Sequence, residues 1–387
     1  MHAGEQALKV KEIFVPDFKI LTLKNTDEWS AALQSVNGMG VSSLPEYCSV
    51  LEGNGDGDAE CIVYTCSEGT IVYPVIRTSL KGLPFDRGTL KDEFDISTPY
   101  GYGGFYVGGT GAACEKITRD FRARLTEYAL DTNIISEFIR FDPIAENNVF
   151  GQGLIDNVRH HNENLYIDLT QSEDDILAGC RSRIRTGIRQ TARLGFVMER
   201  NYTADTITQF IELYHEAMRR RGNSGYLNFK AEFFASLFKK MKGHIELFTV
   251  QEQGNVLGAA ITLRSGDTLE YFLAANRRLQ KRTYVNHFLI MQIAKWAKQQ
   301  GFKKFHLGGG AESIMYFKRS FTRTSLPYYV GTHVFNKKRY AQLVSTGQAM
   351  GVIPRVLPPF FFPGYRAYYS TKADRALLDV LAREKAP

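Results

Sequence analysis

A glycine run followed by a lysine between aromatic residues is the strongest chemical feature of this sequence. Residues 308–321 read GGGAESIMYFKRSF, directly after an expected strand at 303–307. Glycine lets the backbone take positive φ or approach a ligand closely. A short helix beginning near Glu312 would present Phe317, Lys318 and Phe321 to the same region. A lysine in such a partly dry site can stabilise a developing negative charge. The alternative is a glycine turn followed by an ordinary surface lysine.

A stripe of arginines is the second feature. Residues 181–193 read RSRIRTGIRQTAR, and Arg181, Arg185 and Arg189 share one face of a helix. The chain has no acidic residue between Ile176 and Met198. Guanidinium groups pair with phosphate in a bidentate way, whereas a merely solvated helix intersperses acids. The stripe therefore favours anion binding.

A loop rich in tyrosine and glycine is the third feature. Residues 99–104 read PYGYGG, with Tyr100 and Tyr102 separated by glycine. Alternating tyrosine and glycine offers aromatic faces and exposed backbone amides to a ring-shaped substrate. The loop could equally pack between two halves of the protein. Both readings stay open from the sequence.

Several familiar catalytic motifs are absent. No Gly-Lys-Ser/Thr follows the glycine run, so it is no Walker loop. The chain also has no G-x-S-x-G nucleophile elbow. His160 and His161 lack a third ligand at metal spacing, so we predict no metal site. His287 and His306 are candidate general bases, although a lone histidine is more often a structural residue.

Composition points to a large cytoplasmic protein with an anionic partner. The 387 residues are 44% hydrophobic, and this length favours two domains. The net charge of +7 suits a nucleotide, a phosphorylated substrate or RNA, or it only aids solubility. Five cysteines without Cys-x-x-Cys spacing indicate buried free thiols. We expect neither a signal peptide nor a spanning helix, which needs roughly 20 apolar residues.

The elements that must position these residues follow one order twice. Each half predicts a hairpin, then a helix, then a strand, which indicates an α+β fold and suggests a duplication. In the first half we expect a lead-in strand within 1–20, a helix at 26–35, strands at 61–64 and 71–76, a helix near 115–130 and a strand at 134–139. In the second half we expect a strand at 165–169, helices at 173–194, 204–221 and 229–241, strands at 244–250, 256–264 and 268–275, a helix at 286–300 and a strand at 303–307.

These patterns predict an N-terminal domain at 1–160, a catalytic domain at 161–335 and an extension at 336–387. Within the extension, residues 352–371 are aromatic, basic and rich in proline. The prolines prevent an amphipathic helix, so we expect this tail to pack across the body. The alternative is contact with a membrane surface that carries lipid-linked precursors.

The sequence resembles the FemAB (FemABX) family of aminoacyl-transferases and its GNAT-like relatives over about residues 20–335. The motifs of the second half are 183–189 (RIRTGIR), 258–260 (GAA), 286–289 (NHFL), 305–310 (FHLGGG) and 317–321 (FKRSF). In the first half, 98–104 (TPYGYGG) and 137–143 (EFIRFDP) are similar to relatives encoded with polysaccharide-assembly enzymes. The order of the motifs along the chain is more specific than any one of them.

The resemblance implies tandem GNAT-like domains, each a mixed, mostly antiparallel sheet flanked by helices. In that fold, splayed strands hold an acyl donor. The resemblance also implies transfer of an acyl or aminoacyl group to an amine in cell-envelope or polysaccharide biosynthesis. The co-substrate would be acyl-CoA or aminoacyl-tRNA, with no tightly bound cofactor. Lys318 matches the lysine of the family's F-K-x-x-F motif, which is thought to stabilise the oxyanion.

The sequence departs from the family pattern at three places. Val285 stands where the family often has proline, and no long helical arm interrupts 165–335. The GNAT pyrophosphate loop, Q/R-x-x-G-x-G/A, is missing after the strand ending near Ala275. Residues 277–282 (RRLQKR) stand there instead, and their positive charges could bind a pyrophosphate or an RNA backbone.

We therefore predict an N-acyltransferase acting on an amine of a sugar-nucleotide, polysaccharide or cell-wall precursor, an anionic or lipid-linked molecule. It would act in the cytoplasm or at the inner face of the membrane, with tRNA as an additional partner if the donor is aminoacyl-tRNA. The alternative is a non-catalytic RNA- or polyanion-binding protein with a GNAT-like scaffold. The predicted catalytic residues are Lys318 and, as candidate bases, His287 and Tyr271. The predicted substrate-binding residues are Arg185, Arg189, Tyr100, Tyr102, Asn286 and Phe317. The predicted donor-binding residues are Gly308, Gly309, Gly310, Arg278, Lys281 and Arg282.

Overall fold

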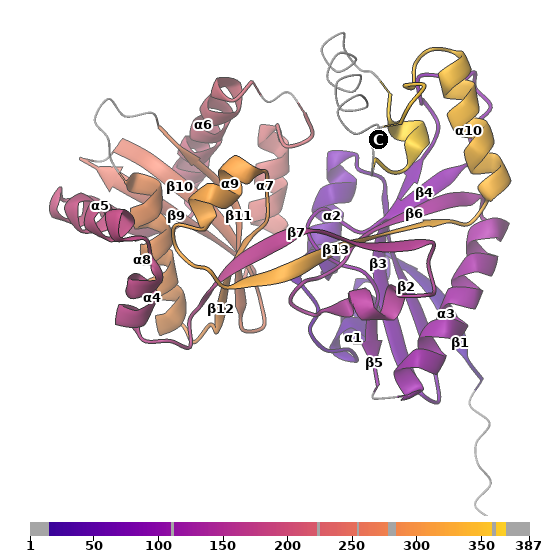
Figure 1. Cartoon of the computed structure of the whole chain (residues 1–387), viewed down its shortest axis with the longest axis horizontal. Coiled ribbons are helices and arrows are strands. Elements are labelled where there is room, and N and C mark those ends of the chain that lie inside the picture. The colour runs from indigo at the N-terminus through magenta and orange to yellow at the C-terminus, as the bar shows by residue number, and fades with distance from the viewer. Residues whose placement is uncertain are drawn as a thin grey trace, which may run out of the picture.

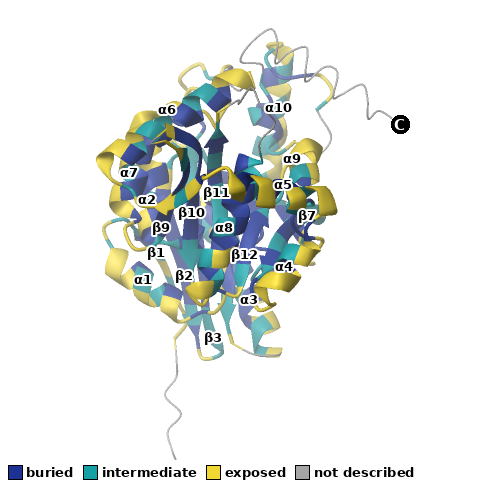
Figure 2. Ribbon diagram, turned by 90° about the vertical axis from the view of Figure 1, so that its left-hand side faces the viewer, coloured by how far each residue is buried: buried dark blue, intermediate teal, exposed yellow. Residues whose placement is uncertain are grey.

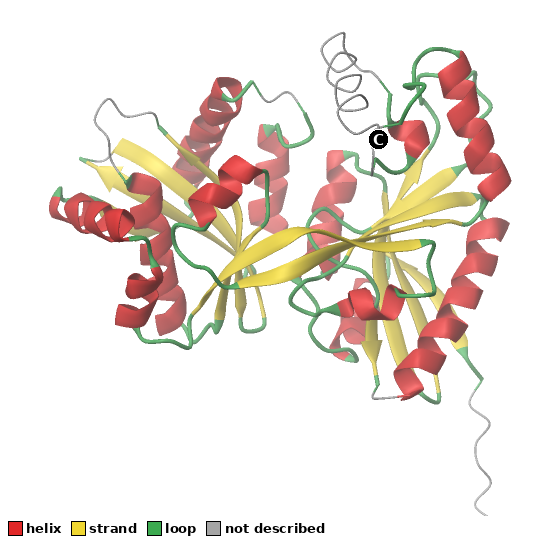
Figure 3. Cartoon of the chain, in the orientation of Figure 1, coloured by secondary structure: helices red, strands yellow, loops and turns green. Residues whose placement is uncertain are grey.

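The computed structural model describes residues 15–109, 112–222, 225–253, 255–277, 284–357 and 361–368. Over these ranges the chain forms two lobes joined by a pair of long strands (Figure 1). Thirteen strands of the described chain make one mixed sheet, and helices cover it in both lobes (Figure 3). This arrangement confirms the predicted layered fold.

The first lobe is built around the hairpin that the sequence predicts. The two hairpin strands are longer than expected and pair antiparallel through nine positions, from Asp58 opposite Arg77 to Cys66 opposite Gly69. A helix that the sequence reading missed begins with a proline at its first position and ends at Gly55, whose φ of 89° suits a left-handed cap. The elements of this lobe are β1 (Asp17–Thr22), α1 (Thr26–Gln34), α2 (Pro45–Asn54), β2 (Asp58–Cys66), β3 (Gly69–Ser79), β4 (Phe94–Ser97), β5 (Tyr106–Gly108), α3 (Ala112–Asp131) and β6 (Ile134–Arg140).

The second lobe follows the predicted order of helices, antiparallel strands, a helix and a strand. Its central helix ends at Gly301, which takes a φ of 86°, as the C-cap signal predicts. The elements of this lobe are α4 (Glu173–Gly179), α5 (Ser182–Arg193), β8 (Val197–Arg200), α6 (Ala204–Arg220), α7 (Ala231–Lys240), β9 (Ile245–Glu252), β10 (Asn255–Ser265), β11 (Thr268–Asn276), α8 (Val285–Gln299), β12 (Lys304–Gly308) and α9 (Glu312–Lys318).

Two long strands, β7 (Asn157–Asp168) and β13 (Ser325–Val334), connect the lobes. They pair antiparallel with each other, while β7 also pairs with β12 and β13 also pairs with β6. The strand order is therefore β1-β2-β3-β4-β6-β13-β7-β12-β11-β10-β9-β8, with β5 paired to β3. Because the sheet runs through both lobes, the expected boundary at residue 160 falls inside β7, and the division into domains stays a prediction.

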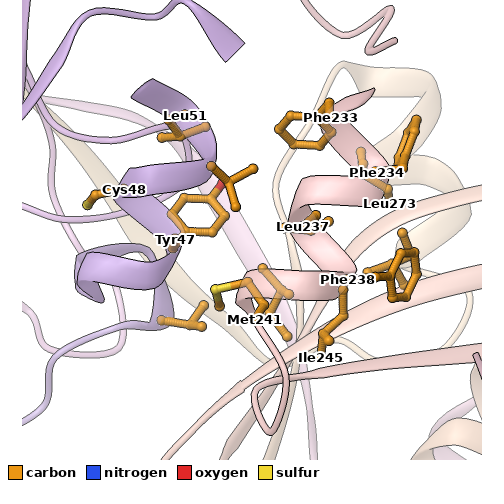
Figure 4. Close-up of a cluster of buried hydrophobic side chains, with 14 of the residues drawn as sticks. Tyr47, Cys48, Leu51, Phe233, Phe234, Leu237, Phe238, Met241, Ile245 and Leu273 are labelled. Carbon is orange, nitrogen blue, oxygen red and sulfur yellow. The ribbon is translucent and has the colours of Figure 1, made fainter. Parts of the chain in front are cut away.

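The lobes also share a hydrophobic core. Tyr47 and Leu51 of α2 face Phe233, Leu237 and Met241 in the region of α7, and all five side chains are buried (Figure 4). Buried residues otherwise concentrate on the strands, and the outward faces of the helices are exposed (Figure 2). Burying apolar area stabilises by about 25 cal/mol per Å². The two lobes are therefore held in a fixed relation by packing as well as by the sheet.

The C-terminal extension packs on the first lobe, as the sequence predicts for the tail. It contains α10 (Lys337–Ala349), and Leu343, Ile353 and Tyr365 join a buried cluster with residues of the first lobe. The Tyr365 hydroxyl donates to an oxygen of Asp95 at 3.1 Å, and Arg366 pairs with the same carboxylate. No described helix is both long enough and apolar enough to cross a membrane.

The prediction of one helix over 173–194 is wrong, because this segment forms two helices, α4 and α5. Cys180 takes an extended conformation between them, with φ of −70° and ψ of 146°. The break is fixed by tertiary contacts, since the Arg181 amide donates to the Ser320 carbonyl at 3.0 Å and the Cys180 side chain is buried. The lead-in strand is present as β1, while Ile13 and Phe14 lie outside the described residues.

The first lobe offers a direct test of its packing. Arg122 and Glu137 are buried and form two parallel hydrogen bonds of 2.9 and 2.8 Å between α3 and β6. Arg122→Leu leaves the carboxylate buried without its cation, so we expect the free energy of unfolding to fall by about 3–5 kcal/mol in urea denaturation. The control is Arg124→Leu, which removes an exposed pair with Glu127 and should change stability by less than about 1 kcal/mol. Equal effects of both changes would contradict this account.

Candidate active site

The sheet opens between β11 and β12. These parallel strands pair over three positions, from Thr268 opposite Lys304 to Glu270 opposite His306. Beyond Glu270, β11 continues to Asn276 along β10, whereas β12 ends at Gly308. Strands that separate in this way leave backbone groups free to bind another molecule. The opening therefore has the geometry expected for holding an extended acyl donor.

A pocket of about 530 Å³ lies at this opening, between the two lobes. The first lobe contributes part of the tyrosine and glycine loop, the connecting strands contribute polar side chains, and the second lobe contributes the glycine run and Lys318. The lining residues are Tyr100, Gly101, Tyr102, Arg140, His161, Asn162, Asn164, Glu270, Tyr271, Phe272, His306, Leu307, Gly308, Gly309, Gly310, Ala311, Lys318 and Tyr328.

Lys318 lies in this pocket at the end of α9, near the point where β7 and β13 enter the second lobe (Figure 1). Its side chain is only 8% exposed, and its Nζ donates to the Gly309 carbonyl at 2.5 Å. Burial lowers the pKa of Lys318 to about 8, because the charged form loses hydration. The glycine turn makes this geometry possible, since a Cβ on Gly309 would lie 2.4 Å from Asn164 Oδ1.

His306 and Tyr102 lie beside the lysine. The two rings are 5.2 Å apart between centroids, and the Gly309 amide lies 3.4 Å from the Tyr102 hydroxyl. His306 is 1% exposed, and burial together with the charge of Lys318 lowers its pKa to about 3. Its imidazole is therefore neutral, and its Nε2 is buried without a hydrogen-bond partner among the described residues.

Glu270 is the acidic residue that the sequence reading missed. It pairs with His306 across the two parallel strands and lines the pocket, so both residues face it from neighbouring strands. Burial, and then the nearby charge of Asp142, raises the pKa of Glu270 to about 8. A carboxyl group with this pKa can accept a proton near neutral pH. The available signal was a single charged residue within the apolar strand 268–275.

The connecting strand β7 adds two asparagines to the pocket. Asn164 is completely buried, and both atoms of its amide have no hydrogen-bond partner among the described residues. Asn162 Oδ1 is likewise buried and unpartnered there. The two asparagines therefore add amide groups to the wall of the pocket. Nothing in the sequence motifs singled out either residue.

The structure brings some predicted residues together and separates others. Tyr100, Tyr102, Tyr271 and the three glycines line the pocket around Lys318. His287 does not line it, because its ring packs against Phe317 at 4.8 Å and Phe321 at 5.2 Å. Burial lowers the pKa of His287 to about 4. His287 therefore lies outside the pocket of Lys318, whereas Glu270 lines it.

Phe317 and Asn286 also lie outside the pocket lining. Phe317 belongs to the aromatic packing that supports α9 from behind. Asn286 donates to Asn276 Oδ1 at 3.0 Å and so connects the start of α8 to the end of β11. Both residues support the elements that shape the opening. Arg278, Lys281 and Arg282, predicted to bind the donor, lie outside the described residues.

Arg181 and Arg185 of the predicted stripe line a different pocket, of about 510 Å³, together with residues of the 319–324 segment. We call it the arginine pocket. Arg185 lines this pocket, but its Nη1 is occupied by the carbonyls of Ala178 and Cys180, at 3.0 and 2.7 Å. Arg189 is exposed and lines neither pocket. The arginine pocket also contains Arg181, Arg319 and Arg323. Asp168 and Asp175 line the same pocket, and Arg319 pairs with Glu312 at 2.6 Å, so the four guanidinium groups are partly neutralised.

Comparisons with known proteins agree with this geometry. Residues 178–319 match the sequence profile described as an acetyltransferase (GNAT) domain. This range contains β11, β12 and Lys318. A crystal structure of FemX aligns with 84% of this chain and 99% of its own, at a TM-score of 0.65 and 13% identity. The structure of L-PGS from Bacillus licheniformis aligns with 83% of this chain and 96% of its own, at a TM-score of 0.52 and 12% identity. No curated protein sequence matches this chain. The chain thus has the fold of FemX, which confirms the predicted resemblance.

The titration of Lys318 can be measured directly. We expect NMR of ε-labelled lysines to show one ammonium that loses its proton at about pH 8, because burial removes its hydration. The signal should vanish in Lys318→Arg, which assigns it. A Lys318 signal that stays protonated above pH 10 would mean that the side chain is hydrated and does not occupy the pocket.

Proposed function

We propose that this chain is an N-acyltransferase that transfers an acyl or aminoacyl group to an amine. The observation that carries the proposal is the nearly buried ammonium of Lys318, directed into a pocket that also contains a carboxyl group with a raised pKa. An ammonium stabilises an oxyanion best where water is excluded. A neighbouring carboxylate can take the proton that an attacking amine must lose. The matched GNAT profile and the FemX fold support this reaction class.

The residues of the pocket supply each part of the transfer. The amine nitrogen attacks the carbonyl carbon of the donor, and the carbonyl electron pair moves onto oxygen. Lys318 has three N–H donors, of which Gly309 accepts one, so two remain for this oxyanion. Ionised Glu270 accepts the amine proton. The intermediate then collapses to the amide and expels the thiol of coenzyme A or a ribose hydroxyl of tRNA, which takes up the proton.

The open strands of the second lobe support a donor site there. In the first lobe, β4 is inserted between β3 and β6, pairing with both. In the second lobe no strand intervenes, because β11 and β12 are direct neighbours that separate after three pairs. An inserted strand occupies the space that a donor would need. We therefore assign the reaction to the second lobe alone.

Two donors fit the proposal. The GNAT profile favours acyl-CoA, whereas the FemABX resemblance keeps aminoacyl-tRNA as the alternative. Both carry phosphates, and the arginine pocket lies on the donor lobe beside the end of α9. The acceptor would be a cell-wall, polysaccharide or lipid-linked precursor in the cytoplasm or at the inner face of the membrane. Incubation with acetyl-CoA or with aminoacyl-tRNA and a panel of such amines decides between the donors.

A non-catalytic polyanion-binding protein is the second candidate function, because four arginines surround the arginine pocket. It predicts binding that weakens steeply with salt and does not involve Lys318. The transfer reaction instead needs Lys318 in its charged form. Removing the Lys318 side chain therefore distinguishes the two functions.

Lys318→Ala should lower kcat by about 10²- to 10³-fold, the effect of removing an oxyanion donor, with an unchanged circular dichroism spectrum. The measurement is the release of free coenzyme A or of deacylated tRNA in the presence of the acceptor amine. Lys295→Ala is the control, because Lys295 is exposed in the same lobe and pairs with Glu173 at the surface. Equal turnover of the Lys318→Ala variant and the wild type would remove Lys318 from the mechanism and favour the polyanion-binding function.

The pH profile of kcat/KM should be bell-shaped and narrow, with a maximum near pH 8. Glu270 acts as a base only when ionised, so activity rises with pH through its pKa of about 8. Lys318 stabilises the oxyanion only when protonated, so activity falls as pH rises through its pKa of about 8. Glu270→Gln should lower the rate and abolish the rising limb while keeping the falling one. A rising limb that persists in this variant would assign the base to another group.

A further inference from the structure

The position of Lys318 in the proposed transfer reaction also brings its nitrogen close to the carbonyl carbon of the donor. A hydrogen bond from an amine to a carbonyl oxygen spans about 2.9 Å, and the C=O bond adds about 1.2 Å. With the usual bent arrangement, the nitrogen lies about 3.6 Å from the carbonyl carbon. Atoms in a near-attack arrangement are about 3–3.5 Å apart. A group that stabilises the oxyanion is therefore nearly in position to attack the same carbonyl.

Lys318 differs from the surface lysines in what surrounds its nitrogen. It lines the pocket with 8% of its surface exposed, and its Nζ contacts the neutral Gly309 carbonyl. Among the described residues, no carboxylate forms an ion pair with it. Lys116, by contrast, is exposed and pairs with Glu68 at 2.8 Å. A carboxylate partner favours the charged form of an amine, whereas burial favours the neutral form, which alone has a free electron pair. The surroundings of Lys318 therefore favour a nucleophilic amine.

The pKa values of the two lysines shift in opposite directions, as these surroundings require. Burial lowers the pKa of Lys318 to about 8, so about half of its side chains are neutral at pH 8. The hydrogen bond to Glu68 raises the pKa of Lys116 above its usual value. At pH 8 the Lys116 ammonium therefore stays charged. Lys116 can serve as a control for Lys318 within the same chain.

Among the described residues that line this pocket, Glu270 is the other group that changes charge near pH 8. Burial raises the pKa values of the four tyrosines of the pocket and lowers those of His161 and His306. These groups are therefore neutral at pH 8, and Arg140 is a fixed positive charge. Ionised Glu270 is thus the group of the pocket that can accept a proton from an attacking Lys318 amine.

We propose that Lys318 is a self-acylation site, which takes the acyl group of the donor when no acceptor amine is bound. The electron pair of the neutral Nζ attacks the carbonyl carbon and forms a C–N bond. The bond from that carbon to the sulfur of coenzyme A, or to the ribose oxygen of tRNA, breaks. The proton that Nζ loses passes through Glu270 to this leaving group.

The product of self-acylation is an uncharged amide. An acylated Lys318 has no ammonium to stabilise an oxyanion, so donor that accumulates without acceptor inactivates the protein. The source of the acyl group and the loss of transfer rest on the proposed function. The reactivity of the amine does not, because it follows from the surroundings of Lys318 alone.

Labelling of the wild-type chain with succinimidyl acetate tests the amine independently of the natural donor. This small reagent acetylates neutral amines, and a pocket of about 530 Å³ has room for it. At pH 8, peptide mass spectrometry should show Lys318 acetylated at least about 10-fold faster than Lys116 and Lys295, two lysines paired with carboxylates at the surface. The rate at Lys318 should rise with pH and level off above its pKa of about 8. The proposal is overturned if Lys318 reacts no faster than the two surface lysines.

A second measurement uses acetyl-CoA or aminoacyl-tRNA, whichever supports transfer, with the acceptor amine left out. The acyl group should appear on Lys318, and transfer activity should fall in proportion to the modified fraction. Added acceptor should slow the modification, because it takes the acyl group instead. Transfer by a chain whose Lys318 stays unmodified under donor alone would overturn the proposal and leave the proposed function intact. Preferential labelling of Lys318 by succinimidyl acetate, with neither donor active, would support the reactive lysine and count against the proposed function.

Discussion

The burial of one ammonium group constrains the rest of the pocket. The Gly309 carbonyl accepts a hydrogen bond from the Lys318 ammonium, which offsets part of the hydration that the buried group loses. That carbonyl faces the lysine only because a glycine turn passes tightly beside Asn164, where a larger residue does not fit. The position of this glycine turn depends on the pairing of β12 with β7. Lysine, glycine run and connecting strand therefore form one unit that reaches from α9 into the centre of the sheet.

The sheet explains why two similar lobes are not equivalent. Both contain a hairpin, a helix and a following strand. In the first lobe, β4 lies between β3 and β6, whereas in the second lobe β11 and β12 are direct neighbours that separate after three pairs. The first lobe instead contributes walls: the tyrosine and glycine loop, Arg140 and, through its contact with α10, the extension. Because β7, β13 and the α2–α7 core fix the lobes together, these walls stay aligned with the reacting groups.

The electrostatic character of the pocket comes from desolvation more than from ion pairs. Burial keeps His306 neutral and raises the pKa of Glu270, so the pocket contains little negative charge near neutral pH. Arg140 and Lys318 then dominate, which suits an anionic acceptor and a reaction that creates an oxyanion. Glu270 and Lys318 have pKa values in the same range, so the proposed base and the proposed oxyanion donor would share a single pH window.

The sequence by itself determined most of the helices and strands, and it singled out Lys318 as the lysine that follows the glycine run. Hairpins, caps and apolar stripes depend on neighbours within a few residues, and the lysine stands beside the glycine run that holds it. Only the tertiary structure decided which distant residues join it. Glu270, Asn164 and Arg140 come from three strands, and pairing between β11, β12 and β7 brings the first two into the pocket that Lys318 lines. The same packing turned His287 toward Phe317 and broke the helix at Cys180, because burial and long-range hydrogen bonds outweigh the local pattern that spacing can reveal.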